Sequence, residues 1–290
     1  MLRNYLSHPV GKLPYWLSKK YRRSLITDAI KHLRKIFTKR EMYGHSFLEF
    51  IRLLRTYLKR APQTHLNKYE AVWKIFCTNT PKIIVEIGSY NGRDAVELSR
   101  MFPPAKVFTF EADANNFEKV KHNVAVRDNI TPIQKAIFSH TGVVQFYPSK
   151  GIKNPSDFRG SGSCLEPRDK LKDTWPELQF DKPIQVPSIT LDDWAKENDI
   201  KRIDFIWMDA QGAELSILQG TGNLLESVKA ILLEIWQESY YKDSGSYNEI
   251  RDYLESHGFT QTHCWLEKDS GDVIFVNNEL TRHNSSGKKI

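Results

Sequence analysis

Residues 83–94 most constrain the fold of this chain, because they read as a buried strand, a glycine turn and the start of a helix. The strand Ile83–Ile87 runs into Gly88, and Gly92 follows four residues later. Nineteen residues after Gly92, a second buried strand, Val107–Glu111, ends in a carboxylate. Such a turn lets backbone approach a ligand, and a carboxylate at the end of the next strand accepts hydrogen bonds from ribose hydroxyls. Together the two segments predict a site for an adenosine-containing cofactor.

The glycine spacing indicates which cofactor this is. Dinucleotide-binding turns carry G-x-G-x-x-G, because the pyrophosphate must reach the helix N-terminus. Here the pattern is E-x-G-x-x-x-G, from Glu86 to Gly92, without the middle glycine. That pattern suits S-adenosylmethionine, whose methionine end needs close backbone contact but carries no phosphate. The alternative is an ordinary strand–helix turn that uses glycine for its conformation alone.

The positive charge of the chain is concentrated at its N-terminus. Residues 1–60 hold 15 Lys and Arg against three acidic residues, a net charge of +12, whereas the whole chain of 290 residues carries +7. The remainder is therefore acidic, at −5. This asymmetry indicates an anionic partner for the segment, such as a membrane surface or a nucleic acid.

We predict that residues 1–79 form a basic, mainly helical extension. An arm with Trp and Tyr among Lys and Arg precedes apolar residues at helical spacing in 24–40, 46–60 and 68–78. Basic amphipathic helices of this kind can lie on anionic membranes, so residues 1–60 are candidates for peripheral membrane contact. The alternative is that the helices cap a sheet or form a homo-oligomer, with their charges in solvent.

Strands and helices alternate from residue 80 to residue 290, which predicts an α/β domain with a mostly parallel twisted sheet and helices on both faces. The expected strands are 83–87, 106–111, 130–136, 142–147, 203–208, 230–235 and 273–277. Residues 148–182 are rich in Gly, Ser, Pro and charge. A loop of that length is usually functional, so we expect a lid on the substrate side, the alternative being a disordered insertion.

The three cysteines, Cys77, Cys164 and Cys264, form neither a disulfide framework nor a zinc spacing, and no metal site is expected. No apolar run approaches the roughly 20 residues that span a bilayer, and the N-terminus lacks the apolar core of a signal peptide. These features predict a reducing, cytoplasmic location, with the basic segment at the inner membrane face.

Six motifs in order resemble the FkbM family of S-adenosylmethionine-dependent methyltransferases. The acidic-x-G-x-x-x-G turn and the later K-x-D-x-E-G-x-E motif carry most of the resemblance. The matching segments are Glu86–Gly92, Phe110–Asn116, His122-Asn123, Gln134–Ser139, Val186–Asp193 and Trp207–Glu214. The resemblance covers roughly residues 80–277 and implies a Rossmann-like class I methyltransferase fold. Two departures stand in the last motif: Met208 for the usual lysine, and Gln211 for a glutamate.

The resemblance also implies roles for the cofactor site. The turn that ends at Gly92 would surround the methionine moiety, and Glu111 would hold the ribose. Asp209, after the strand 203–208, would face the methyl group. The full set of expected cofactor-binding residues is Glu86, Gly88, Ser89, Tyr90, Asn91, Gly92, Glu111, Ala112, Lys135, Ala136 and Asp209.

Methyl transfer to a hydroxyl benefits from a general base, because a neutral hydroxyl is a poor nucleophile. Asp209 is the first candidate and Glu214 the second. The alternative for Glu214 is to stabilise the dipole at the start of a helix.

The sequence therefore predicts O-methylation of a sugar, a glycan or another small-molecule hydroxyl. One competing hypothesis is an RNA methyltransferase whose basic arm binds phosphate, although the acidic cofactor domain argues against it. Another is a catalytically silent scaffold, supported only by the departures at Met208 and Gln211.

Overall fold

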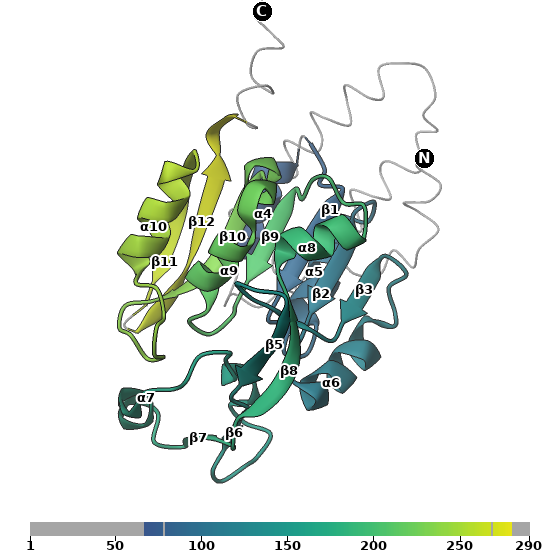
Figure 1. The fold of residues 1–290 in the computed structure, drawn as a ribbon. Coiled ribbons are helices and arrows are strands. Elements are labelled where there is room, and N and C mark those ends of the chain that lie inside the picture. The colour runs from purple at the N-terminus through teal and green to yellow at the C-terminus, as the bar shows by residue number, and fades with distance from the viewer. Residues whose placement is uncertain (1–66, 78, 268, 280–290) are drawn as a thin grey trace, which may run out of the picture. The chain divides into compact units, whose positions relative to one another are not determined.

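A computed structural model describes residues 67–77, 79–267 and 269–279 of the chain (Figure 1). The chain divides into two units, and each is treated by itself. The first unit contributes one described helix, α4 (Asn67–Phe76), whose buried side chains include Tyr69, Val72 and Phe76. The helices predicted in residues 24–60, and the membrane contact predicted for them, lie outside the described residues. The second unit begins at Asn79 and holds the sheets.

A seven-stranded sheet forms the centre of the second unit, in the order β11-β12-β10-β9-β1-β2-β3. Its strands are β1 (Ile83–Ile87), β2 (Lys106–Phe110), β3 (Ile130–Ile133), β9 (Phe205–Met208), β10 (Ala230–Trp236), β11 (Phe259–Leu266) and β12 (Ser270–Asn277). All neighbours pair in parallel except β12, which is antiparallel to both β10 and β11. The predicted parallel sheet is confirmed. The strand β11 was not predicted, because its alternation of buried and exposed residues contains polar Thr, Gln and His.

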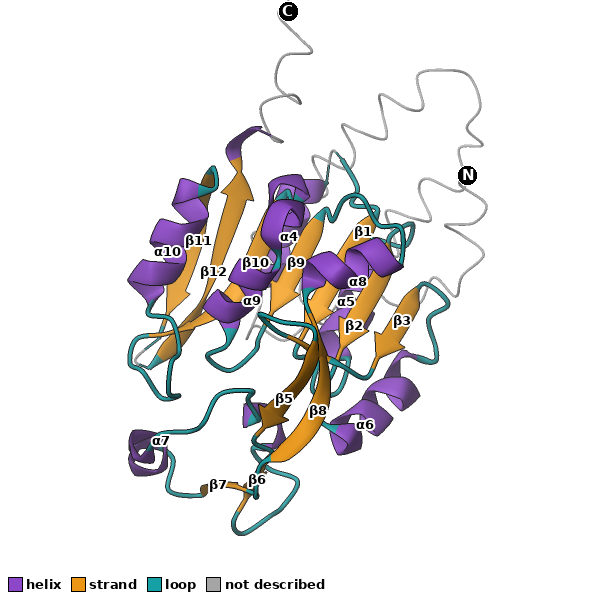
Figure 2. Cartoon of the chain, in the orientation of Figure 1, coloured by secondary structure: helices purple, strands orange, loops and turns teal. Residues whose placement is uncertain are grey.

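Helices lie on both faces of this sheet, with α8 and α9 in front of it and α5 behind it (Figure 2). They are α5 (Arg93–Met101), α6 (Ala114–Val124), α8 (Leu191–Glu197), α9 (Glu214–Gly220) and α10 (Tyr247–Ser256), with a 3₁₀ turn η2 at Gly222–Ser227. Local sequence sets their starts: the Thr190 hydroxyl caps α8, and Ser246 and Glu249 form a capping box on α10.

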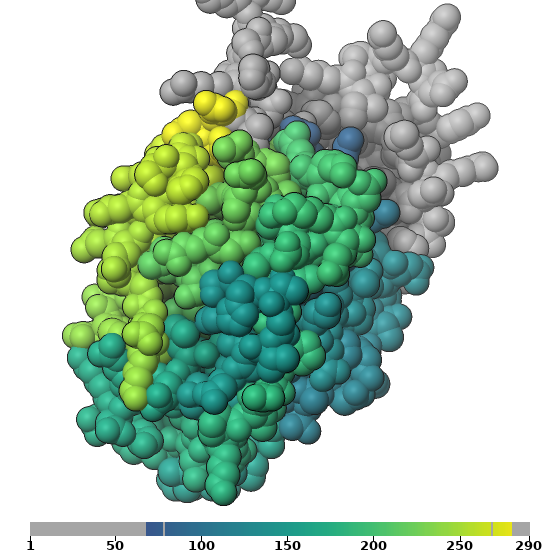
Figure 3. All heavy atoms as spheres, viewed as in Figure 1, coloured from purple at the N-terminus to yellow at the C-terminus, as the bar shows by residue number. Residues whose placement is uncertain are grey.

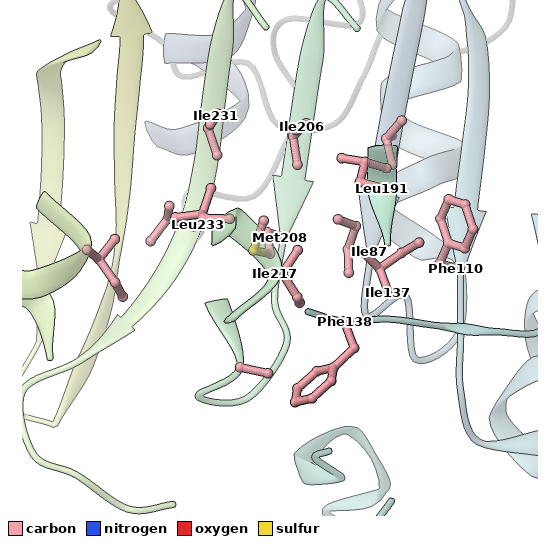
Figure 4. Packing of buried hydrophobic residues seen from close by; sticks show 14 of the residues in the cluster. Ile87, Phe110, Ile137, Phe138, Leu191, Ile206, Met208, Ile217, Ile231 and Leu233 are labelled. Atoms are coloured by element: carbon pink, nitrogen blue, oxygen red, sulfur yellow. The ribbon is translucent and has the colours of Figure 1, made fainter. Parts of the chain in front are cut away.

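The core lies between the sheet and the front helices (Figure 4). Ile87, Ile206, Met208 and Ile231 are buried on adjacent strands, each less than 4% exposed. The ring of Phe110 meets Trp194 of α8 edge-on, with 5.2 Å between ring centroids. Central strands buried on both faces are predominantly apolar in sequence, which is why they could be predicted.

The segment after β3 forms a second, smaller sheet in the order β4-β8-β5, from Ala136–Ile137, Ile184–Ile189 and Gly142–Phe146. Between β5 and β8, residues 148–182 are ordered. They contain the β6–β7 hairpin (Ser149–Gly151 and Leu178–Phe180), the turn η1 (Arg159–Ser161) and α7 (Asp169–Thr174). This secondary structure favours an ordered insertion over the disordered alternative. We call residues 148–182 the insertion; in Figure 1 it lies below the arrowheads of β9 and β2.

Candidate active site

The turn after β1 brings the ends of three strands together. The backbone N–H groups of Gly88 and Ser89 donate to the Phe110 carbonyl at the end of β2, at 3.0 and 3.1 Å. Gly88 has φ +81°, and an added Cβ would lie 1.8 Å from the Asp209 carbonyl oxygen at the end of β9. Only glycine allows this approach, because any side chain would separate β1 from β9.

A cavity that is partly open to solvent lies at these strand ends. Such a crevice outside the carboxyl ends of parallel strands is where open α/β sheets bind ligands. Its lining includes, of the expected site residues, Gly88, Tyr90, Glu111, Ala112, Lys135, Ala136 and Asp209. The structure therefore brings together residues that are as far apart in sequence as Gly88 and Asp209.

Glu111 is the buried carboxylate of the cavity, with 5% of the residue exposed. It accepts hydrogen bonds from the backbone N–H of Tyr90 at 2.6 Å and of Asp113 at 2.8 Å. Burial raises its pKa to about 7, against the lowering effect of these N–H donors. A carboxylate held this way can accept further hydrogen bonds from the two hydroxyls of a ribose.

Four expected cofactor residues do not line the cavity: Glu86, Ser89, Asn91 and Gly92. They build the turn instead. The buried Glu86 accepts from the Ala95 N–H at the start of α5, at 3.0 Å, and from the Thr109 hydroxyl of β2. Burial first, and the charge of Asp94 next, raise the pKa of Glu86 well above its ordinary range. Glu86 lies between two strands and a helix and not in the cavity lining, so the expectation that it binds the cofactor directly is corrected.

The other three shape the same turn. Gly92, at φ +72°, precedes α5, and the Asn91 carboxamide oxygen accepts from the Arg93 N–H at 3.1 Å. The Ser89 hydroxyl is buried and has no hydrogen-bond partner among the residues that the structure describes. These residues set the path of the backbone that the ligand would meet.

The insertion supplies a wall of the cavity that sequence reasoning missed, through Arg159, Gly160, Gly162, Ser163 and Cys164. The Asn116 side chain donates to the Arg159 carbonyl at 2.9 Å, and the Ser163 hydroxyl donates to the Gln211 carbonyl at 2.8 Å. Burial, and then the charge of Glu111, raise the pKa of Cys164 to about 12, so this thiol is not an activated nucleophile.

Asp209 lies where β9 ends and lines the cavity. One of its oxygens accepts from the Gln211 side-chain amide at 2.7 Å, and the same amide nitrogen donates to Glu234 of β10 at 2.9 Å. The Tyr241 hydroxyl donates to the Gln211 carboxamide oxygen at 3.3 Å and to the Ser161 carbonyl at 2.9 Å. Gln211 itself has φ +52°, a costly conformation for a residue other than glycine and one that clusters at functional sites.

Glu214, the second candidate base, is buried and does not line the cavity. Its carboxylate accepts from the Ala210 N–H at 2.9 Å, in the turn before α9. Burial raises its pKa to about 7 although backbone N–H groups of this turn lower it. The structure therefore corrects the prediction: Glu214 stabilises the start of α9, the alternative role, and is not placed to act on a ligand in the cavity.

The family's K-x-D motif has its lysine two residues before the aspartate. In this chain Trp207, and not Met208 as predicted, therefore occupies the position of that lysine. Trp207 is in register with Glu86 on β1, which is in register with Thr109 on β2, so the three side chains share one face of the sheet. A lysine there would lie beside Glu86, and in this chain the Thr109 hydroxyl contacts that carboxyl instead.

The cavity residues fit S-adenosylmethionine. Glu111 suits a ribose, and Ile87, Phe110, Ala136 and Ile137 give apolar walls for a purine ring. Asp209 adds a carboxylate, which suits a positively charged group. Across the described ranges, no group of three or more His, Cys, Asp or Glu is arranged to hold a metal ion.

The sheet order, the single antiparallel strand and this cavity define an S-adenosylmethionine-dependent methyltransferase of class I. The chain belongs to the FkbM methyltransferase family, since the family model described as "Methyltransferase FkbM domain" matches residues 86–260. The predicted family, fold and cofactor are thereby confirmed.

Two curated relatives carry functional names. The 2-O-methyltransferase NoeI of Sinorhizobium fredii is 29% identical over 221 residues, covering 76% of this chain and 89% of the relative. The hexuronic acid methyltransferase AglP of Haloferax volcanii is 21% identical over 154 residues, covering 53% and 55%. Among solved structures, a precorrin-6y C5,15-methyltransferase from Geobacter metallireducens is 12% identical, covers 76% of this chain and 94% of that chain, and has a TM-score of 0.40.

Proposed function

We propose that this protein transfers the methyl group of S-adenosylmethionine to a hydroxyl oxygen of a sugar or glycan. The observation that carries the proposal is the carboxylate of Asp209, which is held by Gln211 and lines the same cavity as Glu111. The names of the relatives NoeI and AglP, an O-methyltransferase and a hexuronic acid methyltransferase, support a sugar as acceptor.

In this proposal each residue has a distinct task. When bound, the cofactor supplies a methyl group on a positively charged sulfur. Glu111 and the turn at Gly88 hold the cofactor's adenosine and methionine ends, and the apolar walls exclude water. The Asp209 carboxylate receives the proton that the acceptor hydroxyl loses as its oxygen takes the methyl group.

The test is to incubate the purified full chain with S-adenosylmethionine and three acceptor sets: neutral oligosaccharides, oligosaccharides with hexuronic acid, and RNA. We expect a mass increase of one methylene on a sugar, and its loss in Asp209→Asn. Asp192→Asn is the control, since Asp192 lies on α8 and pairs with Lys196. Methylated RNA alone would favour the RNA hypothesis, and bound cofactor without any product would favour the silent scaffold.

The expected membrane contact of residues 1–60 is a separate proposal. It concerns where the acceptor is found, for example on a membrane, and not the chemistry at Asp209. Sedimentation with vesicles that contain anionic lipid, compared with neutral vesicles, would test it. In the part of the chain that the structure describes, no helix is long and apolar enough to cross a bilayer.

A further inference from the structure

Glu234 has no role in the function proposed above, yet it is joined to Asp209. It lies on β10, beside β9, and Leu233 of β10 is in register with Met208 of β9. The Gln211 amide nitrogen donates to both carboxylates, at 2.7 Å to Asp209 and 2.9 Å to Glu234. One amide thus connects a carboxylate that lines the cavity to one that does not.

The surroundings of Glu234 are acidic. Asp209 faces it from the end of β9, Glu214 from α9 and Asp272 from β12, and the Tyr241 hydroxyl is also nearby. Among the described residues, no Lys or Arg forms an ion pair with Glu234. Burial, followed by the charges of Asp209 and Glu214, raises the pKa of Glu234 well above its ordinary range. Ionising both carboxyl groups at once carries an electrostatic cost, and that cost favours a proton on one of them.

We propose that Glu234 and Gln211 are positioning residues for Asp209: the amide fixes the Asp209 carboxylate, and Glu234, as the neutral member of the pair, leaves the negative charge on Asp209. The inference rests on the proposed function. The charge then lies on the oxygen atoms that face the cavity, where they can attract a cationic sulfur and accept the hydroxyl proton. Above the pH at which Glu234 ionises, the pair carries a second negative charge.

The charge of the pair can be measured without an acceptor. S-adenosylmethionine has a positively charged sulfur and S-adenosylhomocysteine a neutral one, and the two ligands otherwise differ only by the methyl group on that sulfur. The methyl group does not titrate, so the change of their affinity ratio with pH reports the negative charge near the sulfur. Glu111 lies at the ribose and affects both ligands alike, so its titration cancels in the ratio.

We would measure both affinities by calorimetry from about pH 5 to pH 9 in the wild type, Glu234→Gln, Gln211→Met and Asp272→Asn. In the wild type the preference for the cationic ligand rises by about tenfold as Glu234 ionises. Glu234→Gln keeps a neutral group of the same shape and shows no such rise. Gln211→Met frees Asp209 and lowers the preference at every pH. Asp272→Asn, which removes a cross-strand neighbour of Glu234 and no bond to Gln211, keeps the rise.

The same rise in folded Glu234→Gln, or no rise in the wild type, would overturn the inference while leaving the proposed function intact. An unchanged preference in Gln211→Met would overturn the role of the amide. If folded wild type binds neither ligand, the proposed function fails, and this inference fails with it.

Discussion

Glu111 makes cofactor binding depend on pH in a way that can be calculated. Its pKa of about 7 in the free protein means that about half of the molecules carry a protonated Glu111 at neutral pH. Ribose hydroxyls donate to the charged form, so binding favours ionised Glu111 and lowers its pKa. The affinity for S-adenosylmethionine should therefore fall by about tenfold between pH 8 and pH 6.

Calorimetry in two buffers of different ionisation enthalpy measures both the affinity and the protons released. We expect Glu111 to release about half a proton per ligand at pH 7, and close to none at pH 9. Glu111→Gln should bind more weakly and lose this pH dependence. Glu118→Gln is the control, because Glu118 is an exposed residue of α6 that pairs with Lys121.

The reasoning would be refuted by a wild type whose affinity falls between pH 8 and pH 6 no more than that of Glu111→Gln. Comparing the two proteins is essential, because the ligand's own amino group titrates in both. An identical slope would mean that Glu111 is already ionised in the free protein or does not touch the ribose.

Four further predictions follow from single positions. Gly88→Ala should lower the free energy of unfolding in urea by about 3 kcal/mol or more and abolish cofactor binding. Gly258→Ala is its control: Gly258 has φ +82° and nothing lies within 4 Å of an added Cβ, so the loss should be only about 1 kcal/mol. The pKa of Glu214 is raised to about 7 in the fold, so its ionisation destabilises the folded wild type, and Glu214→Gln lacks this ionisation. The free energy of unfolding of Glu214→Gln should therefore rise relative to that of the wild type by about 3 kcal/mol as the pH increases from 4.5 to above 7. A difference that stays constant over this pH range would contradict the prediction. Tyr241→Phe should lower the free energy of unfolding by about 1–2 kcal/mol, since it leaves the Ser161 carbonyl without its donor. At pH 8, iodoacetamide should label the exposed Cys77 and Cys264 before Cys164, as peptide mass spectrometry can show; equal rates would contradict the raised pKa of about 12.

The central sheet was predictable because its strands are buried on both faces. Phe205–Met208 is a continuous apolar run, and Ile83–Ile87 and Ala230–Trp236 are apolar except for one glutamate each, Glu86 and Glu234. The run predicted at 130–136 is in fact two strands, β3 and β4, in different sheets. Periodicity does not reveal where a chain leaves one sheet for another, because pairing partners are distant in sequence.

The site was predictable where it depends on local turns and not where it depends on packing. Gly88 and Glu111 follow from spacing alone, and both line the cavity. Glu86 and Glu214 have carboxylates like that of Glu111, but hydrogen bonds from backbone N–H groups hold these two carboxylates away from the cavity. Glu234 lies on β10, and Arg159 lies in the insertion. Both are distant in sequence from Asp209, so no sequence pattern connects them to it.

The structure also limits how the insertion can act. Its backbone pairs with the segment after β10, through Arg168 N–H to the Tyr240 carbonyl at 2.9 Å and Lys242 N–H to the Glu166 carbonyl at 2.8 Å. Trp175 of the insertion packs against Trp236 and Tyr240, with ring centroids 5.8 and 5.1 Å apart. In the space-filling view the two segments meet at the surface at the lower left (Figure 3).

A lid that opens as a whole would have to break these hydrogen bonds and separate the aromatic rings. The hydrogen bonds from Asn116 and Tyr241 to the Arg159–Ser161 turn add to that cost. We therefore expect residues 159–182 to stay in place during turnover, as a fixed wall of the cavity. We then expect access for the acceptor to depend on the short stretch 152–158 between β6 and the Arg159–Ser161 turn, where the exposed Ile152 and Phe158 lie. The lid that the sequence predicts would be confined to that stretch, and the rest of the insertion would belong to the scaffold that holds Asp209 and its partners.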